Sequence, residues 1–563
     1  MVGMLAAMPP APSNRPNRDE PLVTPVRDRG DACPGALRLH TADDGALARV
    51  RVPAGVVSAA QAYALADAAE RLGDGALDIT SRGNLQLRGL GPGCGGELAK
   101  LLDAAGLLPA PRHERVRNIV ASPLSGLDGR GHLDVQPLVR ELDVLLCASE
   151  RAPELSGRFL FALDDGRGDM AELAADVMLL AEPGGAEVRV TVGAAWVRVR
   201  AEDGPRAMLL AAEAFLDAAS ATGTRAWRVQ ELPGGGSELA DTAVWRDRVS
   251  GAVGSVGPVG PGGPVGAAAS RGLRPRTRAP QSPAGLGPAG PGSVGPVGSD
   301  APERAAASRR GLRPRTPAPQ SPAGLDLPGS DRAAEPELPG LGHAAKAELP
   351  GPDRAGEPES VGTERAAGLE AAGRSRATRP VGAGGPRPGH VGGGGTGGGG
   401  VSVGVPFGRL SVGAWRALAR VAQEHGTGEL RVTPWRGVVV PGAGPGQLDV
   451  LAGAGLVTDP DSPWLGVGAC TGRPGCAKSL ADVRADATAH LAAGAGGLPV
   501  YWSGCERRCG HPRGTWVDAV ATGDGRYDLA VRGAGTDELP GRQAFPELAD
   551  ALAAARTITT PTK

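Results

Sequence analysis

Short stretches of alternating apolar and polar residues mark the first strands that the chain predicts. The segment ALARVRVP, which ends at Pro53, alternates along its length. Two further stretches alternate on either side of a polar TSRGN corner, with apolar positions at Leu77, Ile79, Leu85 and Leu87. A strand with one buried face shows this period of two residues, so the pattern predicts one strand and then a strand pair joined at the corner.

Between these strands the apolar positions change to a helical period. Ala60, Ala64, Leu65 and Ala68 recur at the spacing of one helix face, and a Gly-x-Gly begins at Gly73. Glycine just after the last periodic residue is typical of a helix end. The segment therefore predicts a helix between the first strand and the strand pair, in a small α+β unit.

A later part of the chain repeats this plan. The run VPAGVVSAAQAYALADAAERLGDGALDIT, from Val52, aligns without gaps with VPFGRLSVGAWRALARVAQEHGTGELRVT, from Val405. Both runs continue into an Arg-Gly pair, at Arg82 and, after one inserted residue, at Arg436. Composition alone could explain shared alanines, but not the ordered Val-Pro, Gly, Thr and Arg-Gly positions. The sequence predicts an internal duplication, each copy being followed by a larger α/β segment.

Low-complexity sequence separates the two copies. Glycine and proline, with 90 and 52 of the 563 residues, form about a quarter of the chain and concentrate between about residues 250 and 400. Few large apolar residues occur there, so burial cannot offset the entropy cost of ordering, and we expect a disordered linker. A proline-rich docking site is the functional alternative.

Charge and the N-terminal sequence restrict the class of protein. Lys and Arg number 60 and Asp and Glu 61, for a net charge of −1, so composition indicates neither a nucleic-acid nor a membrane partner. The first apolar stretch lacks a charged leader and is interrupted by Pro9 and Pro10, and no uncharged apolar run reaches the ~20 residues that span a bilayer. We expect a cytoplasmic protein whose seven cysteines stay reduced.

Four of the cysteines form two tight pairs. Cys470 and Cys476 lie in GACTGRPGC, and Cys505 and Cys509 lie in YWSGCERRCGH, where one helical turn would put both sulfurs on one face. Soft thiolates select an iron–sulfur cluster or zinc, and C-x5-C fits the usual spacing of structural zinc poorly. A 4Fe-4S cluster is the first interpretation, and zinc or unligated thiols are the alternatives.

Several stretches together resemble the nitrite and sulfite reductase superfamily. VRVPAGVVS and LDITSRGNLQLRGL are similar to its ferredoxin-like half domain, VRNIVASPLSG to the start of its haem-protein domain, and the cysteine pairs to its 4Fe-4S motif. The resemblance implies an α+β fold with two ferredoxin-like half domains and two haem-protein-like α/β domains. It also implies that Cys470, Cys476, Cys505 and Cys509 hold the cluster, with Cys509 facing the iron of a tetrapyrrole.

The resemblance also gives expected domain boundaries. They are a disordered tail at 1–35, a first half domain at 36–110, a first haem-protein-like domain at 111–235, a disordered low-complexity linker at 236–400, a second half domain at 401–462 and a second haem-protein-like domain, with the cysteines, at 463–556.

Arginines are the candidate ligands for the tetrapyrrole. Superfamily members hold a macrocycle with many carboxylates, and the guanidinium fork suits carboxylates well. The resemblance implies substrate-binding roles for Arg51, Arg82, Arg117 and Arg158. From spacing alone, the first three would be solvated strand ends. Arg436 lies in the second copy and is expected to be structural.

The histidines have simpler expectations. His511 either caps the turn after the last cysteine or binds a second metal, and the cap is the first interpretation. His113 and His132 flank VRNIVASPLSG and are expected at the surface.

Two departures favour one branch of the superfamily. Reductases hold a small oxyanion with a strand reading roughly Arg-Lys-Phe-Lys, whereas GRFLFALDDG keeps Arg158 and Phe159 but has Leu160 at the second basic position. The segment from the last cysteine to Asp518 is also two residues longer than the reductase pattern. These features resemble the precorrin-3B synthase branch, which implies O2-dependent hydroxylation of precorrin-3A and closure of the ring A lactone in aerobic cobalamin biosynthesis.

This branch makes the tetrapyrrole a substrate. It implies a 4Fe-4S cluster, a mononuclear non-haem iron that activates O2, and an electron donor of unknown identity, although no 2-His-1-carboxylate set stands out for the second iron. A sirohaem-dependent sulfite or nitrite reductase is the nearer alternative. A non-catalytic iron–sulfur electron carrier is the other, but a carrier does not need a polycarboxylate pocket.

Overall fold

The computed structural model describes most of the chain outside its ends and its low-complexity segment. The described residues are 31, 33–237, 239, 249, 384–394, 398–493, 497–512, 514–533 and 547–557. Contacts divide the chain into one unit of residues 1–267 with 376–563 and a second of residues 268–375, which lies outside the described residues. Every described helix and strand belongs to the first unit.

Each copy of the duplication forms a five-stranded antiparallel sheet. The first sheet has the order β1-β2-β5-β4-β13, and the second has the order β11-β12-β15-β14-β3. The strands of the first sheet are β1 His40–Ala42, β2 Gly45–Val50, β5 Leu85–Leu90, β4 Ala76–Ile79 and β13 Arg409–Ser411. Those of the second are β11 Gly389–Val391, β12 Gly400–Gly404, β15 Gly437–Pro441, β14 Glu429–Val432 and β3 Val56–Ser58. The predicted strand and strand pair are confirmed as β2, β4 and β5.

The two copies exchange one strand each. Strand β13 of the second copy pairs with β4 of the first, so that Leu410 lies opposite Leu77. Strand β3 of the first copy pairs with β14 of the second, so that Val57 lies opposite Leu430. All four of these side chains are buried in one hydrophobic core that draws on both copies. The sequence did not predict this exchange.

Helices α1 (Ala59–Leu72) and α7 (Val412–His425) pack against each other between the copies. Trp415 of α7 is fully buried, and its indole N–H donates a hydrogen bond of 2.7 Å to the carbonyl oxygen of Ala62 on α1. A buried tryptophan requires such a partner for its N–H. The helix pair therefore joins the copies through a directional contact as well as through apolar burial.

The helix predicted between β2 and the strand pair is confirmed as α1, but its predicted face is only partly right, because Leu65 and Ala68 are buried and Ala60 is not. A capping box starts the helix: Ser58 Oγ accepts the N–H of Gln61, and the Gln61 side chain accepts the N–H of Ser58. Ala60 is exposed. Besides Leu65 and Ala68, the buried side chains are Ala59, Ala62, Ala66 and Ala69. Alanine occurs on both faces of this helix, so the apolar pattern alone did not identify the buried one.

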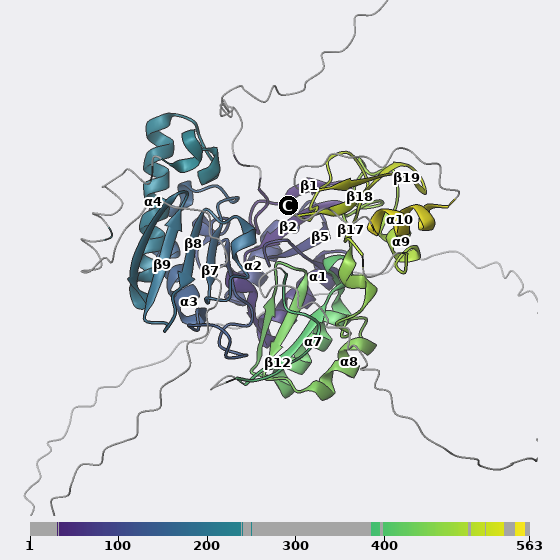
Figure 1. Cartoon of the computed structure of the whole chain (residues 1–563), viewed down its shortest axis with the longest axis horizontal. Coiled ribbons are helices and arrows are strands. Elements are labelled where there is room, and N and C mark those ends of the chain that lie inside the picture. Colours follow the sequence, from purple (N-terminus) through teal and green to yellow (C-terminus); the bar gives the residue numbers. More distant parts are fainter. Residues whose placement is uncertain are drawn as a thin grey trace, which may run out of the picture. The chain divides into compact units, whose positions relative to one another are not determined.

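After α2 (Gly95–Ala104), the chain forms a larger mixed sheet in the order β10-β9-β8-β7-β6. Strands β6, β7 and β8 are parallel, and β9 and β10 are antiparallel additions. Its strands are β6 Ile119–Ala121, β7 Phe161–Asp164, β8 Val177–Ala181, β9 Glu187–Val192 and β10 Ala195–Arg200. Helices α3 (Gln136–Ala148) and α4 (Gly204–Thr222) pack against each other, and α4 also packs on β8 and β9 (Figure 1).

The second copy continues through α8 (Leu448–Gly453) into a smaller sheet in the order β16-β17-β18-β19. Strands β16, β17 and β18 are parallel, and β19 is antiparallel to β18. Its strands are β16 Val467–Ala469, β17 Val500–Ser503, β18 Trp516–Gly523 and β19 Arg526–Arg532. Helices α9 (Val483–Ala489) and α10 (Leu548–Arg556) complete this part (Figure 1). The observed α+β fold, duplicated and split by the low-complexity segment, is the predicted one.

The structure shortens the predicted linker and tail. Strand β11 lies within the range predicted as linker, 236–400, and Leu239 and Val249 are buried in the core of the first mixed sheet. Asp31, in the predicted tail, accepts hydrogen bonds from the fold. Residues 1–30 and 32 of the predicted tail, and residues 238, 240–248, 250–383 and 395–397 of the predicted linker, lie outside the described residues. Among the described helices, none is long and apolar enough to cross a membrane.

Candidate functional site

Arginines gather where the first half domain meets the mixed sheet that follows it. Arg49 and Arg51 are two residues apart on β2 and its extension, so they share one face. Arg82 lies in the turn between β4 and β5, which Gly83 closes with φ of +65° and a 3.0 Å hydrogen bond to the carbonyl oxygen of Thr80. The period of two residues could have identified Arg49, which the sequence analysis missed.

Arg51 is almost completely buried, with 3% of its surface exposed. Its Nη2 donates to the carbonyl oxygen of Gly157 at 3.0 Å, and its Nε donates to that of Arg115 at 3.2 Å. Its Nη1 is buried without a hydrogen-bond partner. A buried guanidinium nitrogen without an acceptor is costly, so a ligand oxygen at this point would stabilise the protein.

The guanidinium groups act on one another. Burial and the charges of Arg49 and Arg82 lower the pKa of Arg51 to about 9. Burial and the charge of Arg228 lower the pKa of Arg82 to about 10. Arg49, Arg51, Arg82 and Arg228, here called the arginine cluster, are therefore held close enough to repel. A ligand that carries several carboxylates relieves this repulsion.

The segment around Cys33 packs against the arginine cluster. The Asp31 carboxylate anchors this segment by accepting the N–H of Gly157 at 2.7 Å and the hydroxyl of Ser156 at 3.0 Å. Burial and the charge of Asp31 raise the pKa of the Cys33 thiol, and the guanidinium groups of Arg158 and Arg51 oppose this shift. Cys33 is isolated in the sequence, and the fold alone brings it to this region.

Three of the four predicted substrate-binding arginines meet around this thiol. Arg51, Arg82 and Arg158 all interact electrostatically with Cys33. Arg158 is exposed, and its guanidinium carbon lies 4.9 Å from the ring centre of Trp227. The structure thus places together three of the residues for which substrate binding was predicted.

Arg117 is the fourth, and its guanidinium already has partners. Its Nε and Nη2 each donate to the Asp143 carboxylate at 2.7 Å, and its Nη1 donates to the carbonyl oxygen of Leu107 at 3.4 Å. It lines a cavity of about 250 Å³ with Arg51. Asp143 is on α3, a partner that sequence spacing could not reveal. The geometry therefore favours a structural role for Arg117.

Leu160 occupies an apolar environment. It is 2% exposed and clusters with Val120, Ala162 and Met170, and the partly buried Trp435 of the second copy packs against this group. Its backbone N–H donates to the Asp176 carboxylate at 2.8 Å, and Asp176 pairs with Arg228 at 2.5 Å. The position predicted to lack half of an anion clamp is thus filled by packed hydrocarbon.

Asp169 lies next to this apolar group, one residue before Met170. It is buried, with 8% exposed, and accepts the hydroxyl hydrogen of Ser122 at 2.6 Å. Burial raises its pKa to about 7, although the Ser122 hydrogen bond opposes the shift. A carboxyl group that titrates near neutral pH can exchange a proton. The sequence analysis missed it because the DDGRGD stretch resembles an ordinary loop.

The cysteines are brought together by parallel strands. Cys470 follows β16 and Cys505 follows the end of β17, and these neighbours are parallel, so their carboxyl ends meet at one edge of the sheet. The loops that follow, residues 470–476 and 504–511, are here called the cysteine loops. The backbone N–H of Gly504 donates to Sγ of Cys470 at 3.2 Å and thereby links them.

The second cysteine loop is not the helical turn that spacing predicted. Arg508 has a φ of +47°, and its N–H donates to the carbonyl oxygen of Cys505 at 3.2 Å. The left-handed residue before Cys509 ends any helical geometry. This conformation carries Cys509 to an exposed position.

The four thiols nevertheless influence one another. Burial raises the pKa of Cys509, and the charges of Cys505, Cys470 and Cys476 raise it further. Four cysteines on two loops, with an N–H bonded to one sulfur, supply the donor set that a 4Fe-4S cluster requires. Within the described ranges, no three His, Cys, Asp or Glu side chains are arranged to hold a metal ion as they stand. The donor chemistry fits the cluster, which stays a prediction.

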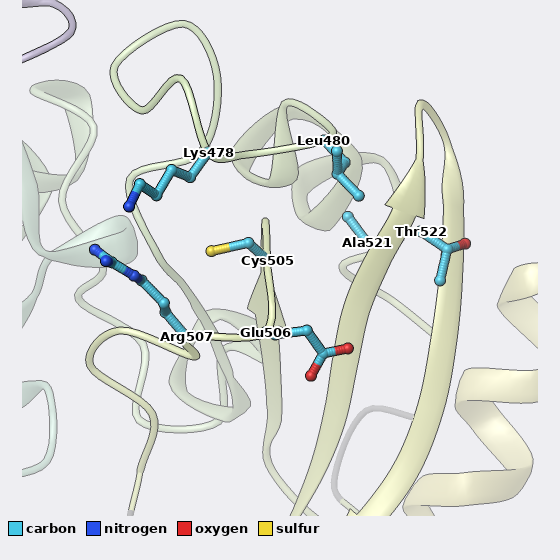
Figure 2. Close-up of a pocket in the computed structure, with 7 residues that line it drawn as sticks. All are labelled: Lys478, Leu480, Cys505, Glu506, Arg507, Ala521 and Thr522. Carbon is cyan, nitrogen blue, oxygen red and sulfur yellow. The ribbon is translucent and has the colours of Figure 1, made fainter. Parts of the chain in front are cut away.

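Beside Cys505 lies a hollow of about 360 Å³. Figure 2 shows the Cys505 sulfur on the same side as the ammonium group of Lys478 and the guanidinium group of Arg507, with Glu506 turned away. Leu480, Ala521 and Thr522 line the other side of the hollow. Lys478 and Arg507 thus place two positive charges beside this candidate metal ligand.

The turn between β14 and β15 corrects the predicted alignment of the two copies. Thr433 exchanges with Gly437 the same two hydrogen bonds that Thr80 exchanges with Asn84, at 2.9 and 3.1 Å in both turns. The turns therefore have equal length, and no residue is inserted. Trp435 takes the position of Arg82, and Arg436 takes that of Gly83.

Of the two histidines predicted at the surface, one is exposed and the other is buried. His132 is exposed, as expected, whereas His113 is buried and its Nε2 lies 2.7 Å from the carbonyl oxygen of Ser149. The surface position predicted for His113 is wrong because α3 ends against it. The His511 ring is stacked on Trp516 with ring centres 5.3 Å apart, and the backbone N–H of His511 donates to the carbonyl oxygen of Arg508 at 3.3 Å.

Two segments of this chain match the family described as the nitrite/sulfite reductase ferredoxin-like half domain. The matched residues are 40–105 and 393–454. They correspond to the two copies and to the two five-stranded sheets. The chain thus has the internally duplicated nitrite/sulfite reductase-like fold.

Known relatives include both kinds of enzyme in this group. A precorrin-3B synthase of Sinorhizobium sp is 34% identical over 170 residues, which are 30% of this chain and 35% of the synthase. A ferredoxin–nitrite reductase of Synechococcus elongatus is 39% identical over 127 residues, 22% of this chain and 25% of the reductase. The matches therefore span about a third and a quarter of these relatives.

Among solved structures, the NirA protein of Mycobacterium tuberculosis is similar in fold. The TM-score is 0.51 at 16% sequence identity, and the match covers 86% of this chain and 73% of NirA. At this identity the similarity concerns the fold alone.

Proposed function

We propose that this chain, with its two nitrite/sulfite reductase half domains, is a precorrin-3B synthase-like monooxygenase of aerobic cobalamin biosynthesis. It hydroxylates precorrin-3A with O2 and closes the ring A lactone. One oxygen atom of O2 enters the product, and the other leaves as water after two electrons arrive from a donor of unknown identity. We place the reaction in the cytoplasm.

The apolar surroundings of Leu160 carry this proposal. A reductase of small oxyanions needs concentrated positive charge on its ligand, and a charge-assisted hydrogen bond contributes roughly 1.5–3 kcal/mol. Here that position is packed among Val120, Ala162 and Met170. Leu160 is only 2% exposed, so this position offers no charge to hold sulfite or nitrite.

The arginine cluster supports the same substrate class. Arg51 presents an unpartnered buried Nη1, and Arg82 lies in a turn whose position the Gly83 hydrogen bond fixes. Carboxylates spread around the rim of a tetrapyrrole could each receive a guanidinium fork. Arg158, exposed beside Trp227, would bind a carboxylate at the outer edge.

Cys470, Cys476, Cys505 and Cys509 would hold a 4Fe-4S cluster. When bound, such a cluster supplies one electron at a time to the reaction. The N–H of Gly504 would stabilise negative charge on the Cys470 sulfur. Ligands for a mononuclear iron do not stand out among the described residues.

The reaction is tested with purified, reconstituted protein, precorrin-3A and a reductant. We expect O2 consumption and one oxygen atom from 18O2 in the product, with slow reduction of sulfite and nitrite. Nitrite reductases among the relatives make a sirohaem-dependent reductase the second candidate. Rapid sulfite or nitrite reduction, bound sirohaem on isolation and no label in precorrin-3A would establish that candidate instead.

A further inference from the structure

Arg436 keeps a backbone conformation that disfavours a side chain. Its φ is +59°, and the equivalent residue of the first copy is Gly83, with φ of +65°. Glycine adopts this region without steric cost, whereas arginine does not. An unfavourable conformation held in place at one copy of a duplicated turn points to a use for the side chain.

The side chain extends from the second half domain to the second cysteine loop and to β16, the strand that leads into the first cysteine loop. Its Nη2 lies 3.5 Å from the carbonyl oxygen of Gly510, in the second cysteine loop. A Cβ atom on Gly468, in β16, would lie 3.8 Å from its Nη1. Gly408 leaves room for the stem, because a Cβ there would lie 2.8 Å from Cδ of Arg436.

Tyr501 completes this contact. The guanidinium carbon of Arg436 lies 5.9 Å from the centre of the Tyr501 ring, within the range of a cation–π contact. The Tyr501 hydroxyl donates to the carbonyl oxygen of Cys509 at 2.5 Å. One guanidinium therefore lies against the second cysteine loop, against the strand that leads into the first, and against the tyrosine whose hydroxyl bonds to the backbone of Cys509.

We propose that Arg436 is a positioning residue that fixes the two cysteine loops relative to each other and offsets the negative charge of their thiolates. The sequence predicts only a structural residue at this position. In the first copy, this turn places Arg82 in the arginine cluster. In the second copy, the equivalent turn places Arg436 near the cysteine loops. This inference rests on the proposed cluster but not on the proposed substrate.

The variant Arg436→Gly tests this role, because it restores the residue of the first copy and removes the unfavourable φ. We expect the folded protein to keep or raise its Tm, while a chelator removes iron on the order of tenfold faster than from the unaltered protein. Backbone amides of the two cysteine loops should exchange hydrogen faster, and those of β4 and β5 should not change. Arg436→Lys, which retains the charge, should restore part of the iron retention.

Arg416→Ala is the matched control. Arg416 is another arginine of the second half domain, paired at the surface with Asp67 and Glu70, and its loss should leave iron retention and loop exchange unchanged. The inference is overturned if Arg436→Gly retains iron and loop protection like the unaltered protein. If the unaltered protein binds no cluster, the cofactor proposal fails, and loop exchange in Arg436→Gly still decides whether Arg436 holds the loops.

Discussion

The backbone N–H of Gly504 donates a hydrogen bond to Sγ of Cys470 across 3.2 Å. The contact joins the loops that follow two parallel strands, and it gives the Cys470 sulfur a donor before any metal is present. Hydrogen bonds to a thiolate stabilise its charge, as is common for cysteines that hold metal clusters. The contact links the loop that carries Cys470 and Cys476 to the loop that carries Cys505 and Cys509.

Cys470→Ser and Cys505→Ser should therefore abolish the cluster. Because cluster binding adds to folding free energy, we also expect Tm to fall by roughly 5 °C or more. Iron and sulfide analysis with thermal unfolding measures both effects. Cys94→Ser is the control, since Cys94 lies at the start of α2 and should keep full iron and sulfide. Loss of the cluster in Cys94→Ser would show that the ligands are misassigned.

Variants of the predicted substrate-binding arginines should differ in whether they lower stability or substrate binding. Arg117→Ala leaves the Asp143 carboxylate without its partner, in a pair whose side chains are only 7% and 19% exposed, and should cost about 3–5 kcal/mol of stability. Denaturant unfolding measures this loss. A small effect on unfolding, with a large effect on substrate binding, would return Arg117 to the binding residues.

Arg82→Ala should behave in the opposite way. It removes one member of a repelling cluster, so the free energy of unfolding should stay equal or rise. Binding of a polycarboxylate tetrapyrrole should weaken about ten- to hundredfold through the loss of one charge-assisted contact. Arg71→Ala, which breaks an exposed pair with Glu97, is the control and should change neither. Unaltered affinity in Arg82→Ala would contradict the proposed substrate site.

Asp169 predicts a specific dependence of stability on pH. Its folded-state pKa of about 7 lies above the ordinary value of 3.8, so between these values the folded state binds more protons than the unfolded state. The stabilisation that the protonated Asp169 carboxyl gives the folded state is therefore complete below the ordinary pKa of 3.8. It is lost as the pH rises toward the folded-state pKa of about 7. Relative to Asp169→Asn, the unaltered protein should lose about 2–3 kcal/mol between about pH 5 and pH 8. Parallel pH profiles for both proteins would refute the assignment.

The low-complexity segment should be dispensable up to a sharp limit. Replacing residues 268–375 with a Gly/Ser linker of ~30 residues should leave iron content and Tm nearly unchanged, since a flexible tether of that length spans packed domains. Extending the deletion through residues 384–394 removes β11, which pairs with β12, and should lower Tm clearly. Equal losses in both variants would give the segment itself a structural role.

The sequence predicted local elements well because they depend on local pattern. Alternation identified β2, β4 and β5, and the glycines after the helix marked the end of α1. Alanine-rich composition hid the buried face of α1, with Ala60 exposed and Ala62 buried. Strand exchange was not predictable from one copy, because pairing between β13 and β4 depends on contacts between residues far apart in sequence.

The candidate site shows the same division. Cysteine spacing marked the four thiols, and Arg51 and Arg82 were found from the family pattern. Cys33 and the Arg117–Asp143 pair depend on tertiary contacts that spacing does not encode. An Arg-Gly match suggested an inserted residue before Arg436, whereas the hydrogen bonds of the Thr433 turn show equal lengths. At this turn, the backbone hydrogen bonds align the two copies more accurately than sequence identity does.

The exchange of β3 and β13 makes the two halves of this chain resemble subunits of a dimer that happens to be covalently joined. Neither sheet is complete without a strand from the other half, so a nick in the low-complexity segment would leave two fragments that need each other to fold. The peptide connection then acts chiefly by raising the effective concentration of one half around the other, commonly to the millimolar range for flexible tethers. Two separate polypeptides, expressed together, would assemble into the same fold.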